Sequence, residues 1–194
     1  AFPVTATDPN FNDEVTLTST GGVYLLCSSP AFFPQGAHAN TTVTATFSWQ
    51  TNCSHVRLQP YQVLFKAEDN DLSTPLVDIK TVNLTVIAPA PQNLIASPIG
   101  TSIQLNWQQE LCSNAIGYKI YRKNSPSGFV PSNCITGIPA FTGFIEIATV
   151  TGITSTSFTD SNNGNGLING LDYCYMIYAY FADGSKSYAS NEIC

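Results

Sequence analysis

The 194-residue sequence predicts an all-β protein made of two tandem β-sandwiches. Three observations lead to this expectation. Apolar residues alternate with polar ones in short segments, clusters of Gly, Pro, Asn and Asp separate these segments, and no window keeps a helical period over three turns. A strand in a two-layer sandwich hides one face and exposes the other, which produces this alternation. We therefore expect one sandwich in each half of the chain.

Each half contains its own series of expected strands. In the first half the alternating segments are Glu14–Thr20, Thr41–Trp49, Tyr61–Ala67 and Asp78–Val86. In the second half they are Ser102–Trp107, Gly117–Arg122, Phe144–Val150, Ser157–Thr159, Tyr173–Tyr180 and Ser187–Ile193. β-branched and aromatic residues dominate both series, as expected for half-buried strands.

A proline-rich segment divides the two series. Ala88-Pro89-Ala90-Pro91 has two prolines in four residues. Proline has no N–H to donate to a sheet ladder, and it restricts the residue before it to an extended conformation. We place the boundary here, with residues 1–88 as the first domain and residues 89–194 as the second. The chain opens within strand-like sequence at Ala1, so we interpret it as part of a longer protein.

Composition excludes several function classes. Only 10% of the residues are charged and the formal net charge is −6, without any basic cluster. Phosphate backbones and anionic membranes need concentrated positive charge, so neither nucleic acid nor a membrane surface is an expected partner. The longest apolar stretches, such as Val23–Leu26 and Ile145–Val150, are far shorter than the roughly 20 residues that span a bilayer.

Six cysteines indicate disulfides and an extracellular location. They stand at positions 27, 53, 112, 134, 174 and 194, without the CxxC pairs of a zinc site. We expect the pairs Cys27–Cys53, Cys112–Cys134 and Cys174–Cys194, each closing a loop worth about 3 kcal/mol. The last pair has the clearest basis, because the turn at Asp183-Gly184 folds the strand around Tyr173–Phe181 back on the C-terminal segment. The alternative is six buried free thiols.

The second half resembles a fibronectin type III module, an immunoglobulin-like sandwich. The resemblance rests on Pro91, Asn93 and Leu94 at its start, then on Trp107, on Tyr118, and on Leu171-x-Tyr173. It implies that Trp107 is buried between the sheets. It also implies that the Tyr173 hydroxyl returns to the backbone as a tyrosine corner.

A narrower resemblance carries an expectation about function. GYKIYR at 117–122, CITGIP at 134–139, TSFTD at 156–160, Tyr173-Cys174-Tyr175 and the closing SYASNEIC are similar to modules of large Bacteroidetes surface proteins. These are the gliding motility-associated proteins exported by type IX secretion. The resemblance implies a cell-surface or secreted adhesive or structural role, with neighbouring domains of the same chain as the first partners.

The first half resembles cadherin-like or PKD-like repeats, through VTATDPNFNDEVTLT at 4–18, FSWQTNC at 47–53 and FKAEDND at 65–71. In cadherin-like repeats, acidic residues at matching positions bind calcium, which implies Asp8, Asn10 and Asp69 as ligands here. Calcium takes six to eight oxygens, so Asp13, Asp71 or other ligands would have to complete the site. The alternative is that both segments are ordinary turns, in which Asp and Asn bond their own backbone.

Residues for catalysis are missing from the sequence. No motif for an activated nucleophile, a zinc helix or a phosphate loop occurs. We expect His38 and His55 at the surface. Glu110, Glu146, Asp160 and Glu192 could form a glycosidase pair, but we expect each on a solvated face. We therefore predict no enzyme.

Two functions remain as hypotheses. The first is a non-catalytic stalk of a large secreted or surface protein, acting as a rigid spacer or as an interaction module that contacts a surface glycan or protein. The second is a carbohydrate-binding accessory region of a secreted polysaccharide hydrolase. Coplanar exposed aromatic side chains, such as Phe129, Phe141 or Tyr188, would distinguish the second.

Overall fold

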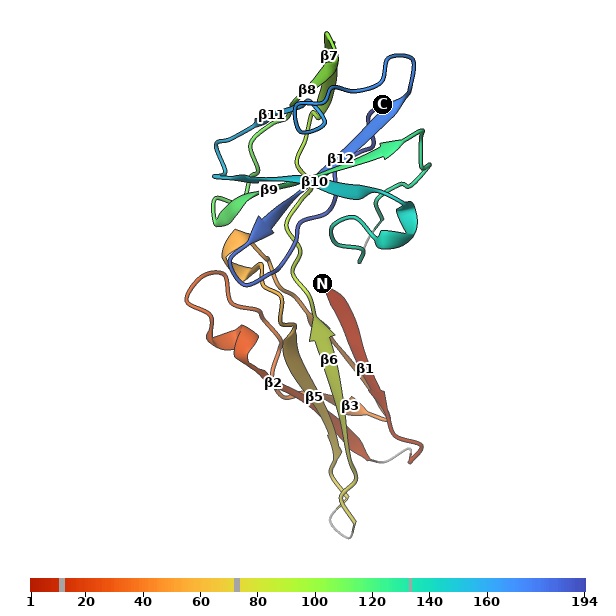
Figure 1. The fold of residues 1–194 in the computed structure, drawn as a ribbon. Helices are drawn as coiled ribbons and strands as arrows, with labels where there is room; N and C mark the ends of the chain where they lie inside the picture. Colours follow the sequence, from red (N-terminus) through yellow and green to blue (C-terminus); the bar gives the residue numbers. More distant parts are fainter. Residues whose placement is uncertain (11–12, 72–73, 133) are drawn as a thin grey trace. The chain divides into compact units, whose positions relative to one another are not determined.

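The computed structural model describes residues 1–10, 13–71, 74–132 and 134–194 (Figure 1). These residues divide into two compact units, residues 1–55 with 59–86 and residues 56–58 with 87–194. In sequence, the predicted domains meet between residues 88 and 89. Within the described ranges the structure is all-β, and its helical turns are the 3-10 segments η1 (Gly22–Leu25), η2 (Cys53–His55) and η3 (Ala140–Thr142).

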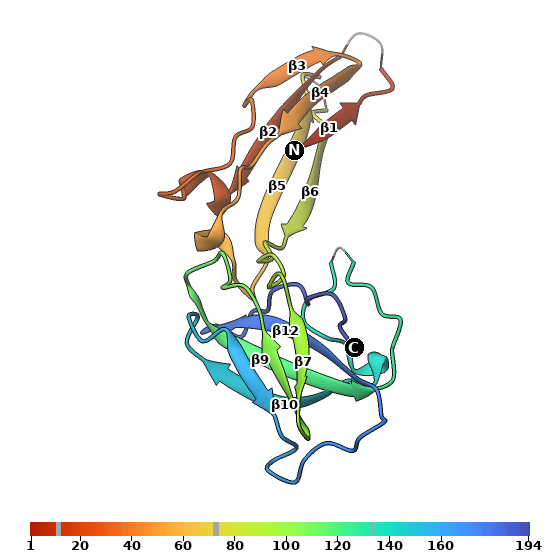
Figure 2. The same ribbon diagram turned by 90° about the horizontal axis from the view of Figure 1, so that it is seen from above.

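The first unit contains two antiparallel sheets (Figure 2). One sheet pairs β1 (Phe2–Thr7) with β4 (Thr42–Phe47), so that Phe2 lies opposite Phe47. The other has four strands in the order β3-β2-β5-β6. They are β3 (Ala37–Asn40), β2 (Glu14–Gly21), β5 (Tyr61–Asp69) and β6 (Val77–Leu84).

The core of the first unit follows directly from the alternation in the sequence. β4 buries every second residue, and β5 does so from Tyr61 to Phe65, which places Phe47, Val63 and Phe65 in the core. The Phe47 and Phe65 rings meet edge to face with their centroids 5.9 Å apart, and the Phe2 and Phe47 ring centroids are 5.0 Å apart. Each fully buried side chain of this size contributes about 1.5–3 kcal/mol.

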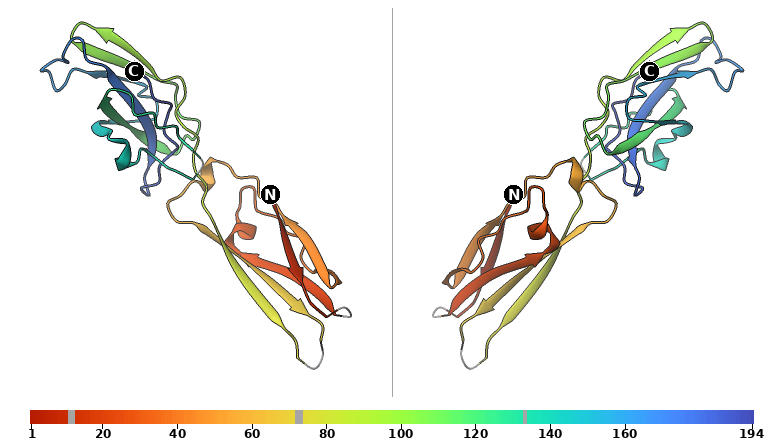
Figure 3. Two further views of the ribbon diagram at one scale, coloured as in Figure 1. Left: turned by 90° about the vertical axis from the view of Figure 1, so that its right-hand side faces the viewer. Right: turned by 90° about the vertical axis from the view of Figure 1, so that its left-hand side faces the viewer.

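The second unit has two three-stranded sheets (Figure 3). The first runs β7 (Ile95–Ile99), β8 (Ser102–Asn106) and β11 (Ser157–Asp160). The second runs β10 (Ile145–Thr151), β9 (Ala115–Asn124) and β12 (Tyr173–Phe181). Single bridges from Tyr175 to Ile193 and from Tyr180 to Lys186 attach the C-terminal segment to β12.

Both aromatic features implied by the fibronectin type III resemblance are present. Trp107 is buried and its ring meets that of Tyr118 edge to face at 5.2 Å. The backbone N–H of Ile168 donates to the hydroxyl of Tyr173 at 3.0 Å, which is the geometry of a tyrosine corner. Trp107 therefore packs in the core of the second unit, and Tyr173 fixes the segment that precedes β12.

Three strands lie outside the segments that the sequence pattern selected. They are β1 (Phe2–Thr7), β3 (Ala37–Asn40) and β7 (Ile95–Ile99). Pro3 and Pro98 interrupt two of them, and a proline inside a short run weakens the strand signal because it removes an N–H donor. In the opposite direction, the expected strand Ser187–Ile193 forms isolated bridges in place of a continuous ladder.

Candidate functional site

The strongest cluster of polar side chains in the second unit surrounds Asp160, the last residue of β11. Arg122 of β9 and Tyr175 of β12 lie directly opposite each other in the ladder, so both reach the same carboxylate. Arg122 Nη1 lies 2.9 Å from Asp160 Oδ2 and 3.1 Å from Oδ1, and the Tyr175 hydroxyl donates to Oδ2 at 2.8 Å. The cluster thus ties strands of both sheets together.

Further contacts complete this cluster. The backbone N–H of Asn162 donates to Asp160 Oδ1 at 3.0 Å, and Arg122 Nη2 donates to the side-chain oxygen of Asn162 at 3.3 Å. The Arg122 guanidinium also lies over the ring of Tyr173, 5.5 Å from its centroid. Each oxygen of Asp160 therefore accepts two hydrogen bonds from the protein itself.

Burial gives this cluster its electrostatic character. The Asp160 side chain is 4% exposed and that of Arg122 is 16% exposed, so the charges are shielded from water. Burial, together with the hydrogen bond to Asp160, raises the pKa of Tyr175 well above its ordinary value. Tyr175 therefore remains a hydrogen-bond donor to Asp160 across the physiological pH range.

A small cleft of about 320 Å³ opens beside the cluster. Its lining is polar and comes mainly from the end of β11 and the following turn: Arg122, Glu146, Ile147, Phe158, Thr159, Asp160, Ser161, Asn162 and Asn163. Glu146 is already paired, because Lys119 Nζ contacts both of its oxygens at 2.9 Å. Burial raises the pKa of Glu146, but the hydrogen bonds from Lys119, Thr149 and Tyr121 outweigh it and lower the pKa.

Three polar residues that the sequence predicted at the surface are buried. Glu110 and Asp160 were expected on solvated faces, yet they are 4% and 3% exposed. His55 was expected at the surface and is 2% exposed; its Nδ1 accepts from the N–H of Asn52, and its Nε2 lies 2.9 Å from the carbonyl of Ser28. A polar residue buried through partners that are distant in sequence leaves no local signal, whereas His38 is exposed as expected.

The structure places the expected calcium ligands in two turns of the first unit. Asp8 follows β1 and its Oδ1 accepts from the N–H of Asn10 at 2.7 Å. Asp69 ends β5, and its Oδ1 accepts from Leu76 at 2.9 Å and from Asp71 at 3.3 Å. Both carboxylates are buried and Asn10 is exposed, while Asp69 Oδ2 has no hydrogen-bond partner among the described residues. One oxygen of each carboxylate is thus used within its own turn.

The cysteines differ from expectation in two of the three pairs. The Cys174–Cys194 disulfide forms, with the two sulfur atoms 2.01 Å apart. Cys53 and Cys112 are also disulfide-bonded, but Cys27 and Cys134 are exposed free thiols. The pairings Cys27–Cys53 and Cys112–Cys134 are therefore wrong. They assumed that cysteines pair within each half of the chain, and that assumption does not determine which way a thiol points.

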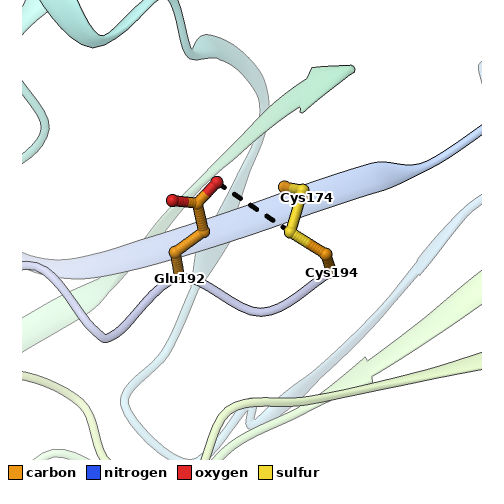
Figure 4. A group of neighbouring side chains, drawn as sticks. All are labelled: Cys174, Glu192 and Cys194. Carbon is orange, nitrogen blue, oxygen red and sulfur yellow. Dashed lines mark hydrogen bonds between the residues drawn. A yellow bond between two sulfur atoms is a disulfide. The ribbon is translucent and has the colours of Figure 1, made fainter. Parts of the chain in front are cut away.

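Glu192 lies beside the Cys174–Cys194 disulfide (Figure 4). Within the described ranges, these are the three His, Cys, Asp or Glu side chains whose ligand atoms come close enough to suggest a metal. The disulfide sulfurs carry neither a proton nor a thiolate, so the 3.9 Å approach of Cys194 Sγ to Glu192 Oε1 is a contact without metal-ligand character. Glu192 instead accepts from the N–H and the hydroxyl of Ser127, both at 2.7 Å.

The aromatic residues named for glycan binding do not form a flat platform. Phe129 and Phe141 lie 6.0 Å apart, but their rings are inclined by 79°. Phe141 is 79% exposed, whereas Phe129 packs against the core cluster around Cys174 and Met176. A sugar ring could therefore stack on the exposed Phe141 ring alone, because the Phe129 ring is nearly perpendicular to it.

Comparison with known proteins finds similar solved structures. A two-domain fibronectin type III segment of chicken tenascin matches with 14% sequence identity and a TM-score of 0.40, over 98% of this chain and 89% of that one. The FN1–FN3 domains of chicken CNTN1 match with 10% identity and a TM-score of 0.40, over 98% of this chain and 61% of that one. No protein-family model and no curated protein matches the sequence.

Within the described residues, no helix has both the length and the apolar character needed to cross a bilayer.

Proposed function

We propose that this chain is a non-catalytic stalk segment of a large secreted or cell-surface bacterial protein. Its two units act as a rigid spacer or interaction module within the longer protein. We extend the proposal to the gliding motility-associated, type IX-secreted kind, on the basis of the ordered motifs from GYKIYR to SYASNEIC. Tandem sandwiches suit this role because their sheets give each unit a fixed length and stiffness.

One observation carries the proposal. Asp160, a buried carboxylate beside a polar cleft, accepts all its hydrogen bonds from Arg122, Tyr175 and Asn162. A catalytic or ligand-binding carboxylate needs an oxygen directed at its substrate, while this one is used in joining two sheets. The Cys174–Cys194 disulfide adds support for an oxidising compartment outside the cytosol.

Binding to an array of glycans and polysaccharides tests the proposal. We expect no glycan to bind more tightly than a dissociation constant of about 100 μM, which corresponds to about 5 kcal/mol. Any positive signal is repeated with Phe141→Ala, because Phe141 is the most exposed of the aromatic candidates. Tighter binding that this substitution abolishes would replace the stalk with the carbohydrate-binding function.

A further inference from the structure

The free edge of β6 is the longest regular strand edge that the first unit presents. β6 ends the four-stranded sheet, with β5 as its partner in the described part of the chain (Figure 1). It has eight residues and no proline, and its ladder with β5 runs without a register shift. Natural proteins usually protect such an edge by shortness, proline, a bulge or charged side chains, because exposed N–H and C=O groups attract another strand.

Several other edge strands carry such protection, whereas the shorter β4 has neither a proline nor a register shift. β3 and β11 have four residues each, and β1 and β7 contain Pro3 and Pro98. The β10 ladder shifts register between Glu146 and Ala148. β6 lacks these three devices but carries Asp78 and Lys80, and charged side chains also protect an edge. A further strand can therefore join β6 where its own charges complement this pair.

The ladder with β5 determines which backbone groups of β6 are free. The N–H of Asp69 donates to the carbonyl of Leu76 at 3.2 Å, so Leu76 directs its backbone groups toward β5. Hydrogen-bonded and non-hydrogen-bonded pairs alternate along an antiparallel ladder. Val77, Ile79 and Thr81 therefore direct their N–H and C=O groups to the free edge.

The same alternation separates the side chains of β6 onto two faces. Val77 and Ile79 are 49% and 54% exposed and lie on one face. Asp78 and Lys80 lie on the other, where they line a groove of about 390 Å³ together with Phe65 and Val82. Their side chains are 66% and 77% exposed, and they form an ion pair with each other at 3.4 Å.

This charge pattern is complementary to itself. When two antiparallel copies of β6 meet about a two-fold axis at Ile79, Asp78 of each copy lies opposite Lys80 of the other, and Ile79 lies opposite Ile79. The Asp78–Lys80 pairs then occupy non-hydrogen-bonded positions, where side chains lie closest. Val77 and Thr81 form the flanking hydrogen-bonded pairs through their free backbone groups.

We propose that β6 is a self-association surface, through which two copies of this chain pair edge to edge about a two-fold axis at Ile79. The occupant is a second copy because one strand supplies both partners of each ion pair in a single register. Such an isologous contact closes at two copies and does not propagate into a fibre. In a stalk, it would join two surface proteins side by side.

Sedimentation of the 194-residue chain over a concentration series tests this proposal. We expect a monomer–dimer equilibrium. Lys80→Asp and Asp78→Lys should each raise the dissociation constant about tenfold or more, because both place like charges opposite each other. The combined exchange, Asp78→Lys with Lys80→Asp, should restore the dimer because it restores the complementary pairs.

The two single variants control for general charge effects, since they shift the net charge of −6 in opposite directions. Melting curves confirm that each variant is folded. The proposal is overturned by a chain that stays monomeric at every concentration, or by a dimer that both single variants leave unchanged. Failure of the combined exchange to restore the dimer would equally exclude this register. None of these outcomes bears on the glycan test of the stalk function.

Crosslinking tests the register directly in a background that carries Cys27→Ser and Cys134→Ser. Ile79→Cys places two cysteines in a hydrogen-bonded pair with Cα atoms about 5.5 Å apart, within the range of a disulfide. Thr81→Cys is the matched control, because the same register separates its two copies by roughly 13 Å. A crosslink at position 79 and none at position 81 is expected, and the reverse result excludes the two-fold axis at Ile79.

Discussion

Arg122 and Asp160 form a shielded ion pair between the two sheets of the second unit. They lie 2.9 Å apart at their closest atoms, and their side chains are 16% and 4% exposed. Charges held in this way cost much to desolvate, and that cost is offset only while both partners remain. Lys119 and Glu146 form a comparable contact at 2.9 Å, but about a third of each side chain is exposed.

Loss of the tyrosine corner should destabilise the second unit. Tyr173→Phe removes the acceptor of the Ile168 N–H but keeps the ring beneath Arg122. We expect a loss of about 1–2 kcal/mol in the free energy of unfolding, measured by urea denaturation. Tyr188→Phe is the matched control, because the Tyr188 hydroxyl has no hydrogen bond in the described structure, and equal effects of both changes would refute the corner.

Glu110 should make stability depend on pH. Its carboxyl is buried, its Oε1 accepts from the N–H of Cys112, and its Oε2 has no partner in the described residues. Burial raises the pKa of Glu110 above its ordinary value, despite hydrogen bonds from Cys112 and Leu111 that lower it. The folded chain thus holds this proton more tightly than the unfolded chain, and ionisation of Glu110 opposes folding.

The stability contributed by protonated Glu110 is therefore fully present below the unfolded pKa and lost as pH rises through the folded pKa. Urea denaturation from about pH 4 to about pH 8 gives the free energy of unfolding of the wild type and of Glu110→Gln, and the difference between the two measures the contribution of Glu110. We expect the wild type to lose stability relative to the variant as the pH rises. A difference that is independent of pH would show that Glu110 titrates normally.

The cysteines should give a defined thiol count. The unreduced chain should react with a thiol reagent at two positions, Cys27 and Cys134, identified by peptide mapping. Replacement of both Cys174 and Cys194 by Ala should cost about 3 kcal/mol, because their disulfide closes a segment with a sequence separation of 20. Six oxidised cysteines would mean that Cys27 and Cys134 find partners after all.

Calcium should leave the melting temperature unchanged. Asp8 and Asp69 each use one oxygen in their own turn, and among the described residues the acidic, His and Cys side chains that approach one another closely enough for an ion are Cys174, Glu192 and Cys194 of the second unit. Titration with calcium, and with magnesium as a control, measures this by thermal unfolding. A rise in melting temperature specific to calcium that Asp69→Asn abolishes would instead support the cadherin-like site.

The all-β class and most strands could be predicted because alternation is a local property of the sequence. The burial of Trp107 and of Tyr173 was also predictable, through the resemblance to fibronectin type III modules. The partners of Asp160 were not, because Arg122 is 38 residues away and only the sheet register brings it near. The same reason explains the two wrong cysteine pairings, which assumed pairing within each half of the chain without knowledge of side-chain direction.

We infer that the buried polar groups of this chain stabilise its sheets and do not serve a ligand. Asp160→Asn tests it most directly, with Glu146→Gln as the exposed control, by urea denaturation. We predict a loss of about 3–5 kcal/mol for Asp160→Asn, because Arg122 is left as an unpaired buried charge, and less than about 1 kcal/mol for the control. Residues kept for binding or catalysis usually cost stability, so an Asp160→Asn variant as stable as the wild type, or more stable, would contradict the account.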